Sequence, residues 1–256
     1  MAKKDYQTKQ EQAIWQYIQD KDIVDNELLG DIFPDLSKNK RNKILHGLYR
    51  KGYLRRVRRG LYYNSEKIGD FYKLAIIIHA GYVGLNSALR YYNLIDYEDF
   101  TIFVMTKSFQ RKISLKGTNY YIHYVPLKDM FIGFEKKDDI YISSIEKTIF
   151  DCFLKPREVG YSNLTKAIYS SNIKWDKFIG FYKRIKNNAL YQRTGYILEL
   201  MKKNIGINLP TNVMEFLQKG VKCPVRLTPN KSKSKFNIKW KIQDNLGEKN
   251  IFSWWY

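Results

Sequence analysis

Three helix-start signals in the first 65 residues, followed by an arginine-rich two-stranded pattern, constrain the fold of this chain more than any other feature. Residues suited to cap a helix precede three stretches of apolar residues at helical spacing: Thr8, Asp25 and Ser37. The first of them fits a capping box with Glu11. The second helix must end before Pro34, because the residue preceding a proline is disfavoured in the helical conformation. We predict the third helix from Lys38 to about Lys51, with Gly52 ending it.

The third predicted helix has two chemically different faces at about 100° per residue. Ile44, Leu45 and Leu48 share one face and can pack on the first two helices. The opposite face is polar and basic, with small residues that allow close approach: Asn39, Lys40, Lys43, His46, Gly47 and Arg50. We expect this face to contact the major groove of DNA, with Asn39 reading bases and Lys38 and Lys51 binding phosphates at the helix ends.

Residues 53–63 follow as two short strands whose turn region is rich in arginine: Arg55, Arg56, Arg58 and Arg59. Three helices, of which the third is basic, and then a basic ribbon give the element order of a winged helix-turn-helix domain. In such a domain the ribbon arginines reach phosphates or the adjacent minor groove. The alternative is a three-helix scaffold that is merely basic.

The distribution of charge supports a polyanionic partner. The chain has 45 lysine and arginine residues against 25 aspartate and glutamate residues, a net charge of +20. Residues 36–65 hold ten basic residues and no acidic one, and residues 216–243 hold eight basic residues and no acidic one. Solvated surfaces usually mix the two signs, so acid-free blocks of this length favour phosphate binding. Nucleic acid and an anionic membrane surface are the two candidates.

Nucleic acid is the stronger candidate of the two. The most apolar stretch, residues 74–89, is interrupted by polar and glycine residues and falls short of a membrane-spanning helix. The first residues are polar, so we expect no export signal. Cys152 and Cys223 stand far apart, and the three histidines are scattered. We therefore expect a cytoplasmic protein without a metal site or cofactor and with no membrane partner.

The rest of the chain predicts a mixed α+β domain over residues 67–256, after a DNA-binding domain over residues 1–66. Residues 224–227 and 235–242 form the best alternating pattern and predict a closing β-hairpin. Its core-facing side chains would be Phe236, Ile238, Trp240 and Ile242. Its lysines are a second candidate contact to nucleic acid: Lys231, Lys233, Lys235, Lys239 and Lys241. An edge strand that lysines protect from aggregation explains them equally well.

The common catalytic motifs are missing from the sequence, which has no GxxxxGK[ST], GxGxxG, HExxH or GxSxG pattern. Glu146 and Asp151 are the residues that a metal-dependent nuclease would use. However, Glu146 fits a second capping box with Ser143, and the five-residue spacing is poor for a shared site. We predict that the protein is not an enzyme and keep a nuclease as an alternative.

Short segments of the chain, spread from about residue 8 to 245, resemble the AbiEi antitoxin family in their order. They are Arg59-Gly60-Leu61-Tyr62, Ser87-Ala88-Leu89 with Tyr92 and Leu94, residues 144–151, Pro156 with Gly160, residues 195–199, Val225-Arg226-Leu227 and Trp240. Members of this family are predicted transcriptional regulators of abortive-infection systems. The lysine-rich C-terminal half and the last residues, Ser253 to Tyr256, depart from the family pattern.

The resemblance implies a winged-helix domain that represses its own operon from double-stranded promoter DNA with inverted repeats. It also implies a C-terminal domain with antitoxin activity of type IV. Such antitoxins are paired with a nucleotidyltransferase-like toxin that they are not expected to bind directly. An unpaired regulator and an RNA-binding module that uses the basic C-terminal hairpin are the remaining alternatives.

Overall fold

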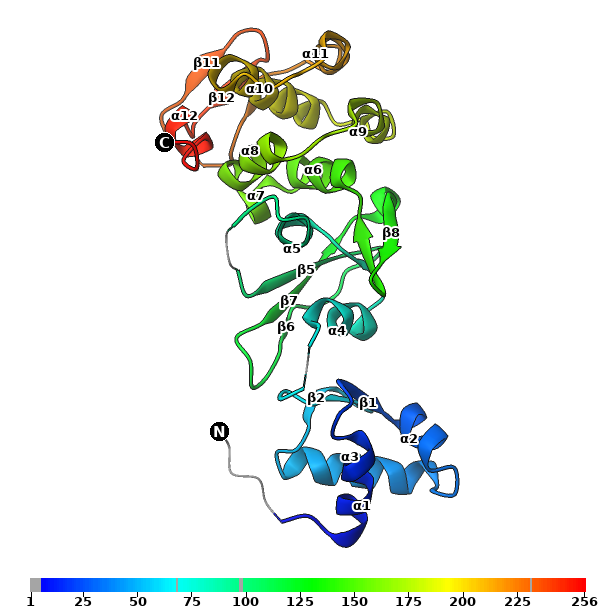
Figure 1. The fold of residues 1–256 in the computed structure, drawn as a ribbon. Helices are drawn as coiled ribbons and strands as arrows, with labels where there is room; N and C mark the ends of the chain where they lie inside the picture. Colours follow the sequence, from blue (N-terminus) through cyan, green and yellow to red (C-terminus); the bar gives the residue numbers. More distant parts are fainter. Residues whose placement is uncertain (1–5, 68, 97–98, 231) are drawn as a thin grey trace. The chain divides into compact units, whose positions relative to one another are not determined.

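The structure, a computed structural model, describes residues 6–67, 69–96, 99–230 and 232–256. The chain is a mixed α+β protein, as predicted (Figure 1). By the contacts within it, the chain divides into two units. Unit 1 comprises residues 1–81 and 100–125, and unit 2 comprises residues 82–99 and 126–256. This division differs from the predicted boundary after residue 66.

Unit 1 begins with the predicted helices, and their caps form as expected. The elements are α1 (Lys9–Ile18), β1 (Ile23–Asp25), α2 (Asn26–Ile32), α3 (Lys38–Arg50), β2 (Arg55–Arg58) and β3 (Leu61–Tyr63). The side chain of Thr8 accepts from the Glu11 amide while the Glu11 side chain accepts from the Thr8 amide, which completes the capping box. Asp25 and Ser37 likewise accept hydrogen bonds from the first turns of α2 and α3.

Strand β1 was not predicted from the sequence, because three residues are too few for an alternating pattern. It pairs antiparallel with β3, which also pairs antiparallel with β2, so the sheet order is β1-β3-β2. The apolar faces of α1, α2 and α3 bury a common core with this sheet: Ile14, Ile18, Val24, Leu29, Ile44, Leu45, Leu48, Leu54 and Tyr62. The basic segment of residues 36–65 is thus part of a folded scaffold.

The second half of unit 1 explains why the unit continues beyond residue 66. It contains α4 (Phe71–Ile78), β5 (Thr101–Thr106), β6 (Ile113–Ser114) and β7 (Tyr121–Pro126), with strands in the order β6-β7-β5. Leu61 and Tyr63 of β3 belong to the same buried cluster as residues of α4, β5 and β7. The Tyr63 hydroxyl also donates to the Lys116 carbonyl at 2.5 Å. β3 therefore contributes side chains to two cores of unit 1.

Unit 2 is mainly helical. It contains β4 (Tyr82–Val83), α5 (Leu85–Tyr91), the 3-10 helix η1 (Lys128–Met130), β8 (Phe134–Lys137), β9 (Ile140–Ser143), α6 (Ile145–Leu154), α7 (Pro156–Val159), α8 (Tyr161–Ser170), α9 (Trp175–Tyr182), α10 (Asn188–Ile205) and α11 (Thr211–Gln218). β9 pairs with β4 in parallel and with β8 antiparallel. Helix α6 packs against α5, α8, α9 and α10, so it forms the centre of the unit. We observe no helix in the described part of the chain that is long and apolar enough to cross a membrane.

The end of unit 2 differs from the predicted hairpin. The strands are β10 (Val225–Arg226), β11 (Lys235–Asn237) and β12 (Ile242–Asp244), in the order β10-β12-β11, and α12 (Glu248–Ile251) follows them. The strand predicted over residues 235–242 breaks after Asn237, whose side chain accepts from the Trp240 amide. Lys241 then adopts a positive φ of 47°. The antiparallel hairpin is therefore β11–β12, whereas β10 pairs with β12 in parallel.

This break also changes which side chains are buried. Trp240 and Ile242 are fully buried, but Phe236 is 51% exposed and Ile238 is 83% exposed, so their predicted core positions were wrong. Trp240 lies on Gly195 of α10, where a Cβ atom would stand only 2.0 Å from the indole ring. Its Nε1 donates to Glu199 at 2.8 Å. The turn thus places one large ring in the core and leaves the two preceding apolar side chains outside.

Candidate nucleic-acid interface

Helix α3 separates its apolar and basic residues onto opposite faces. Ile44, Leu45 and Leu48 are buried in the core of the three-helix scaffold. The predicted contact residues on the other side are all exposed: Lys38, Asn39, Lys40, Lys43, His46 and Arg50. Residues three or four positions apart are neighbours on a helix, so four of them form one stripe along the helix: Asn39, Lys43, His46 and Arg50. The lysines form no ion pair with any other residue that the structure describes.

The side-chain amide of Asn26, which no sequence pattern marks, sets the position of α3 relative to α2. Asn26 Nδ2 donates to Asn42 Oδ1 at 2.8 Å and to the Lys38 carbonyl at 3.2 Å. Asn42 is exposed on α3 and stands four residues, or about one helical turn, after Lys38. These two bonds hold the first turn of α3 against the start of α2. The stripe is therefore presented by a helix whose orientation is fixed.

Gly47 of α3 and Lys51 just after its C-terminal end face inward, although we predicted both on the DNA-contacting surface. Gly47 lies against α1, because a Cβ atom there would stand 2.2 Å from Glu11 Oε1, so its predicted place on the DNA face was wrong. Lys51 Nζ lies 2.5 Å from Glu11 Oε2. Burial acts to raise the pKa of Glu11, but hydrogen bonds from Lys51 and Thr8 outweigh it and hold that pKa below its usual value. Lys51 is thus engaged inside the scaffold.

The four predicted arginines of the β2–β3 ribbon form an outer pair and an inner pair. Arg58 and Arg59 are exposed at the turn, where Gly60 adopts a φ of +79°. Arg55 and Arg56 are partly buried and lie opposite Tyr63 and Tyr62 across the sheet. The register shifts between Arg56 and Arg58, which is typical of a β-bulge. The bulge explains why the two pairs differ in exposure.

A hollow of about 510 Å³ lies beside the basic stripe. It is lined by residues from the starts of α1 and α3: Thr8, Gln10, Glu11, Ser37, Asn39, Lys40, Lys43 and Ile44. Helix N-termini have backbone amides and a partial positive charge that attract phosphate. Two lysines add full charges, and the one carboxylate of the hollow already binds Lys51. The hollow therefore has the chemistry of a phosphate site.

A second hollow, of about 410 Å³, joins α2, α3 and the ribbon turn. Its basic residues are Lys38, Arg41, Arg58 and Arg59, and its acidic residues are Asp25 and Glu27. Asp25 already caps α2 through the Leu28 amide at 2.8 Å. Arg41 was not among the predicted contact residues, although it stands in the acid-free block of residues 36–65. The ribbon turn and the start of α3 thus converge on one cationic surface.

The lysines of the second candidate contact fall into two groups. Lys233 and Lys235 are exposed and form no ion pair with other described residues. Lys239 forms an ion pair with Glu199, and Lys241 Nζ donates to the Lys222 carbonyl at 2.8 Å. Lys231 lies outside the described residues. Two of the five predicted residues are therefore available to an external phosphate.

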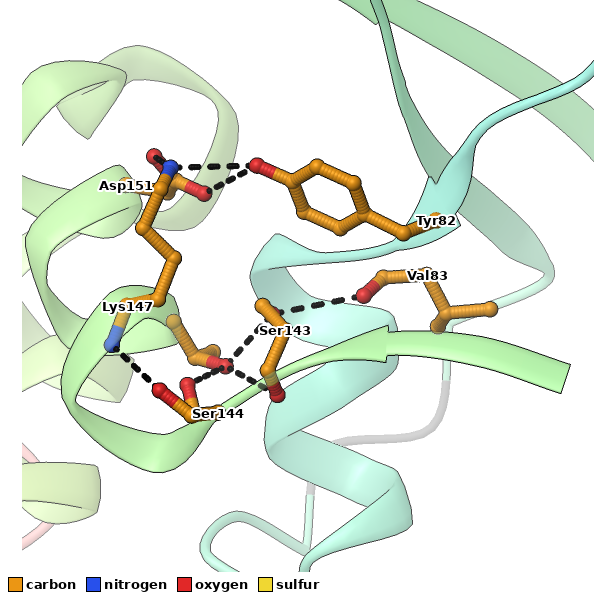
Figure 2. Close-up of polar contacts among 7 residues, drawn as sticks. Tyr82, Val83, Ser143, Ser144, Lys147 and Asp151 are labelled. Carbon is orange, nitrogen blue, oxygen red and sulfur yellow. Dashed lines mark hydrogen bonds and ion pairs between the residues drawn. The ribbon is translucent and has the colours of Figure 1, made fainter. Parts of the chain in front are cut away.

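The residues of the nuclease alternative belong to the interior of unit 2. Asp151 and Lys147, one helical turn apart on α6, form an ion pair in which both side chains are fully buried (Figure 2). The Tyr82 hydroxyl donates to Asp151 Oδ2 at 3.0 Å and accepts from Lys147 Nζ at 3.0 Å. Burial raises the pKa of Asp151 to about 6 and lowers the pKa of Lys147. A carboxylate that is fully buried in this way cannot contact a nucleic-acid substrate.

Glu146 lies near Asp151 in sequence but has different partners. Its Oε1 accepts from the Lys174 amide at 3.3 Å, and its Oε2 pairs with Lys177 at 3.2 Å. The N-cap of α6 is Ser144, which accepts from the Lys147 amide, so the predicted capping box of Ser143 and Glu146 was wrong. Ser143 Oγ instead contacts the Thr148 hydroxyl and the Val83 carbonyl (Figure 2). Within the described residues, no group of three or more histidine, cysteine or acidic side chains is placed to bind a metal ion.

Comparison with known proteins gives a likeness of fold. No protein-family model matches the chain, and no curated protein matches it either. Among solved structures, the crystal structure of the RV2827C protein from Mycobacterium tuberculosis is similar, with a TM-score of 0.64 and 13% sequence identity. The match covers 94% of this chain and 93% of that one. The likeness extends over most of both chains, and at this identity it shows a similar fold alone.

Proposed function

We propose that the protein is a transcriptional regulator that binds specific double-stranded DNA through a winged helix-turn-helix domain in its first 65 residues. The observation that supports this most is the exposed stripe of α3, together with the hollow that Lys38 and Arg41 of the same helix share with Arg58 and Arg59 of the β2–β3 turn. The element order α1-β1-α2-α3-β2-β3 is typical of winged-helix domains. Strand β1, which the sequence did not predict, fits this order as well.

In this proposal α3 enters the major groove and the β2–β3 turn acts as the wing. Asn39 presents an amide that can bond bidentately to an adenine edge, and Arg50 can do the same to guanine. Lys40 and Lys43 line the hollow between the starts of α1 and α3, where a backbone phosphate would bind. Arg58 and Arg59 would contact phosphates or the adjacent minor groove.

The same proposal assigns the protein to antitoxins of the AbiEi type, on the strength of the ordered sequence segments that resemble that family. It would repress its own operon from inverted repeats in the promoter. A nucleotidyltransferase-like toxin would be its functional counterpart, without direct contact between the two proteins. Binding to promoter DNA would place the protein in the cytoplasm.

The test is a gel-shift titration of the full chain against its own upstream DNA, with a shuffled duplex of equal length as competitor. We expect specific retention of the upstream fragment. Replacing Arg58→Glu and Arg59→Glu together should abolish retention and leave the thermal melt unchanged, because both side chains are exposed. The matched control is Lys183→Glu with Arg184→Glu, an exposed pair in unit 2 with the same change of charge.

Three outcomes would contradict the DNA-binding proposal. They are equal retention of both duplexes, loss of binding in the control variant, and unchanged binding in the Arg58 and Arg59 variant. The antitoxin assignment has its own test. Expression of the protein should restore growth to cells that express the nucleotidyltransferase-like gene beside it, and growth arrest in its presence would refute the assignment.

A further inference from the structure

We infer that the outer face of the β10-β12-β11 sheet in unit 2 binds single-stranded nucleic acid, with a base stacked on Phe236. This inference concerns a different surface from the proposed DNA-binding domain and does not depend on it. It begins with Phe236, whose ring is 51% exposed on β11, and with Ile238 in the turn that follows, which is 83% exposed. Exposed apolar side chains on an edge strand promote aggregation, so an occupant is expected.

The pairing of the strands places three side chains in one row. Gln243 of β12 is the register partner of both Arg226 on β10 and Phe236 on β11. Paired residues project from the same face of a sheet, so the row across the face is Arg226, Gln243 and Phe236. Arg226 Nε donates to Gln243 Oε1 at 3.2 Å, which confirms that these two side chains are neighbours. An aromatic ring, an amide and a guanidinium in one row suit the face and the edges of an unpaired base.

The surroundings of this row are cationic. Residues 216–243 contain no acidic residue, and Lys233 is exposed in the segment that leads into β11. Two acidic residues brought in from elsewhere are occupied. Glu199 binds Lys239 and the indole of Trp240, and Asp244 is buried and accepts from the Tyr196 hydroxyl at 2.8 Å. A phosphate chain next to Phe236 would therefore meet positive charge.

The loop that bears Lys233 is anchored at its base. Ser232 Oγ donates to the Asn245 carbonyl at 2.9 Å, and the Asn245 side chain donates to the carbonyls of Thr228 and Asn230. The Thr228 amide in turn donates to Asn245 Oδ1 at 3.0 Å. Anchoring reduces the entropy that the loop loses when a ligand binds. The chain on either side of this loop is thus tied to Asn245 through Thr228, Asn230 and Ser232.

The opposite face of the same sheet cannot be the binding surface. Leu227 and Ile242 are buried, and Gln192 of α10 donates to the carbonyl of Trp240 at 2.9 Å. That face packs on the helices of unit 2. Side chains that alternate along β12 are therefore divided between a core and an open surface, with Gln243 on the open one.

The experiment measures fluorescence anisotropy of labelled oligo(rU) and oligo(dT), each about 12 nucleotides long, with the full chain. The protein should carry Arg58→Glu and Arg59→Glu, so that the proposed DNA-binding surface does not contribute. We expect both probes to bind, since both offer stackable bases and phosphates, and their ratio shows whether the ribose hydroxyl is read. An RNA duplex of equal length should bind more weakly, because its bases are stacked on one another.

Phe236→Ala should weaken binding by about 5- to 100-fold, the range for loss of one stacked base. Phe236→Tyr should bind within about twofold of the parent, because tyrosine also stacks. Phe109→Ala is the control, a phenylalanine in unit 1 that is 74% exposed and whose replacement should change nothing. Lys233→Glu should also weaken binding, and Arg184→Glu, an exposed position with the same change of charge, should not.

The inference is overturned if the parent protein binds neither probe, or if the duplex binds as well as the single strands. It is also overturned if Phe236→Ala binds like the parent or if Phe109→Ala weakens binding as much. Thermal melts of all variants verify that they fold. None of these outcomes touches the retention of upstream DNA by the unmodified chain, so the two proposals can fail separately.

Discussion

The two acid-free blocks of the chain, residues 36–65 and residues 216–243, have similar densities of positive charge but use it differently. In the first block the cations gather on one face of α3 and on the β2–β3 turn. In the second block they are spread over loops and a small sheet, and Lys239 is bound by an acid from α10. The comparison shows that acidic residues from distant segments decide whether a lysine or arginine can bind an external phosphate. A count of charges along the sequence does not reveal these partners.

Three lysine–acid pairs illustrate this at different depths. The side chains of Lys147 and Asp151 are 0% exposed, those of Lys51 and Glu11 are 24% and 9% exposed, and those of Lys239 and Glu199 are 53% and 31% exposed. The strength of a pair grows as water is excluded, and so does the cost of breaking it.

The buried pair should show the largest effect on stability. Asp151→Ala leaves the charge of Lys147 without a partner in the core, so we expect a loss of about 3–5 kcal/mol in the free energy of unfolding. Urea denaturation at neutral pH measures it. The matched variant, Lys147→Met with Asp151→Leu, removes both charges and should lose much less. If the single and double variants are equally stable, the pair does not hold the core as described.

The first block should show the stronger dependence on salt. With about six phosphate contacts, affinity for the upstream duplex should fall roughly a thousandfold between about 50 and 200 mM salt. Binding of oligo(rU) by the second block, with Lys233 as a phosphate contact, should fall by less than about tenfold over that range. Anisotropy titrations at several salt concentrations give both slopes. A flat response of the duplex would refute the use of the first block for phosphate binding.

The half-buried pair should affect stability moderately and in a pH-dependent way. Glu11→Gln should cost about 1–2 kcal/mol at pH 7, because it weakens the cap of α1 and the bond to Lys51. Glu11 has a lowered pKa in the folded protein, so its contribution is present above its usual pKa of 4.5 and is lost as the pH falls below that value. Denaturation curves between pH 3 and pH 7 should therefore converge for the parent and the variant. Glu27→Gln, an exposed control on α2, should leave the pH profile unchanged.

The exposed pair should show the smallest effect. Glu199→Gln should change the free energy of unfolding by less than about 1 kcal/mol, because surface ion pairs are weak. It also releases Lys239, so binding of oligo(rU) should become slightly tighter, by no more than a few-fold. A calorimetric melt and an anisotropy titration measure the two effects. A large loss of stability would mean that the bond from Trp240 to Glu199 dominates at this position.

These contrasts also show what the sequence could predict. The caps at Thr8, Asp25 and Ser37 were confirmed because each depends on residues only three positions apart. The exposed stripe of α3 was predicted because helical spacing fixes which residues share a face. Gly47 was misplaced because it lies at the edge of that face, where the position of α1 decides the outcome.

The remaining errors have a common origin in long-range packing. The indole of Trp240 packs over Gly195, which stands forty-five positions earlier in the sequence. This packing interrupts the strand predicted over residues 235–242, where polar and apolar residues alternate regularly. Lys147 and Asp151 stand four residues apart, the spacing that brings two side chains together on a helix. Their third partner, the Tyr82 hydroxyl, comes from strand β4. Neither Gly195 nor Tyr82 can be assigned to these partners by local pattern.

The division of α3 into two non-overlapping residue sets has a consequence for how such a chain can change over generations. The residues that hold the helix in place are Ile44, Leu45, Leu48 and Asn42, whereas those that face outward are Asn39, Lys43, His46 and Arg50. Substitutions in the second set leave every contact of the first intact. On the proposed function, a lineage carrying this scaffold can therefore exchange one DNA target for another without passing through unstable intermediates.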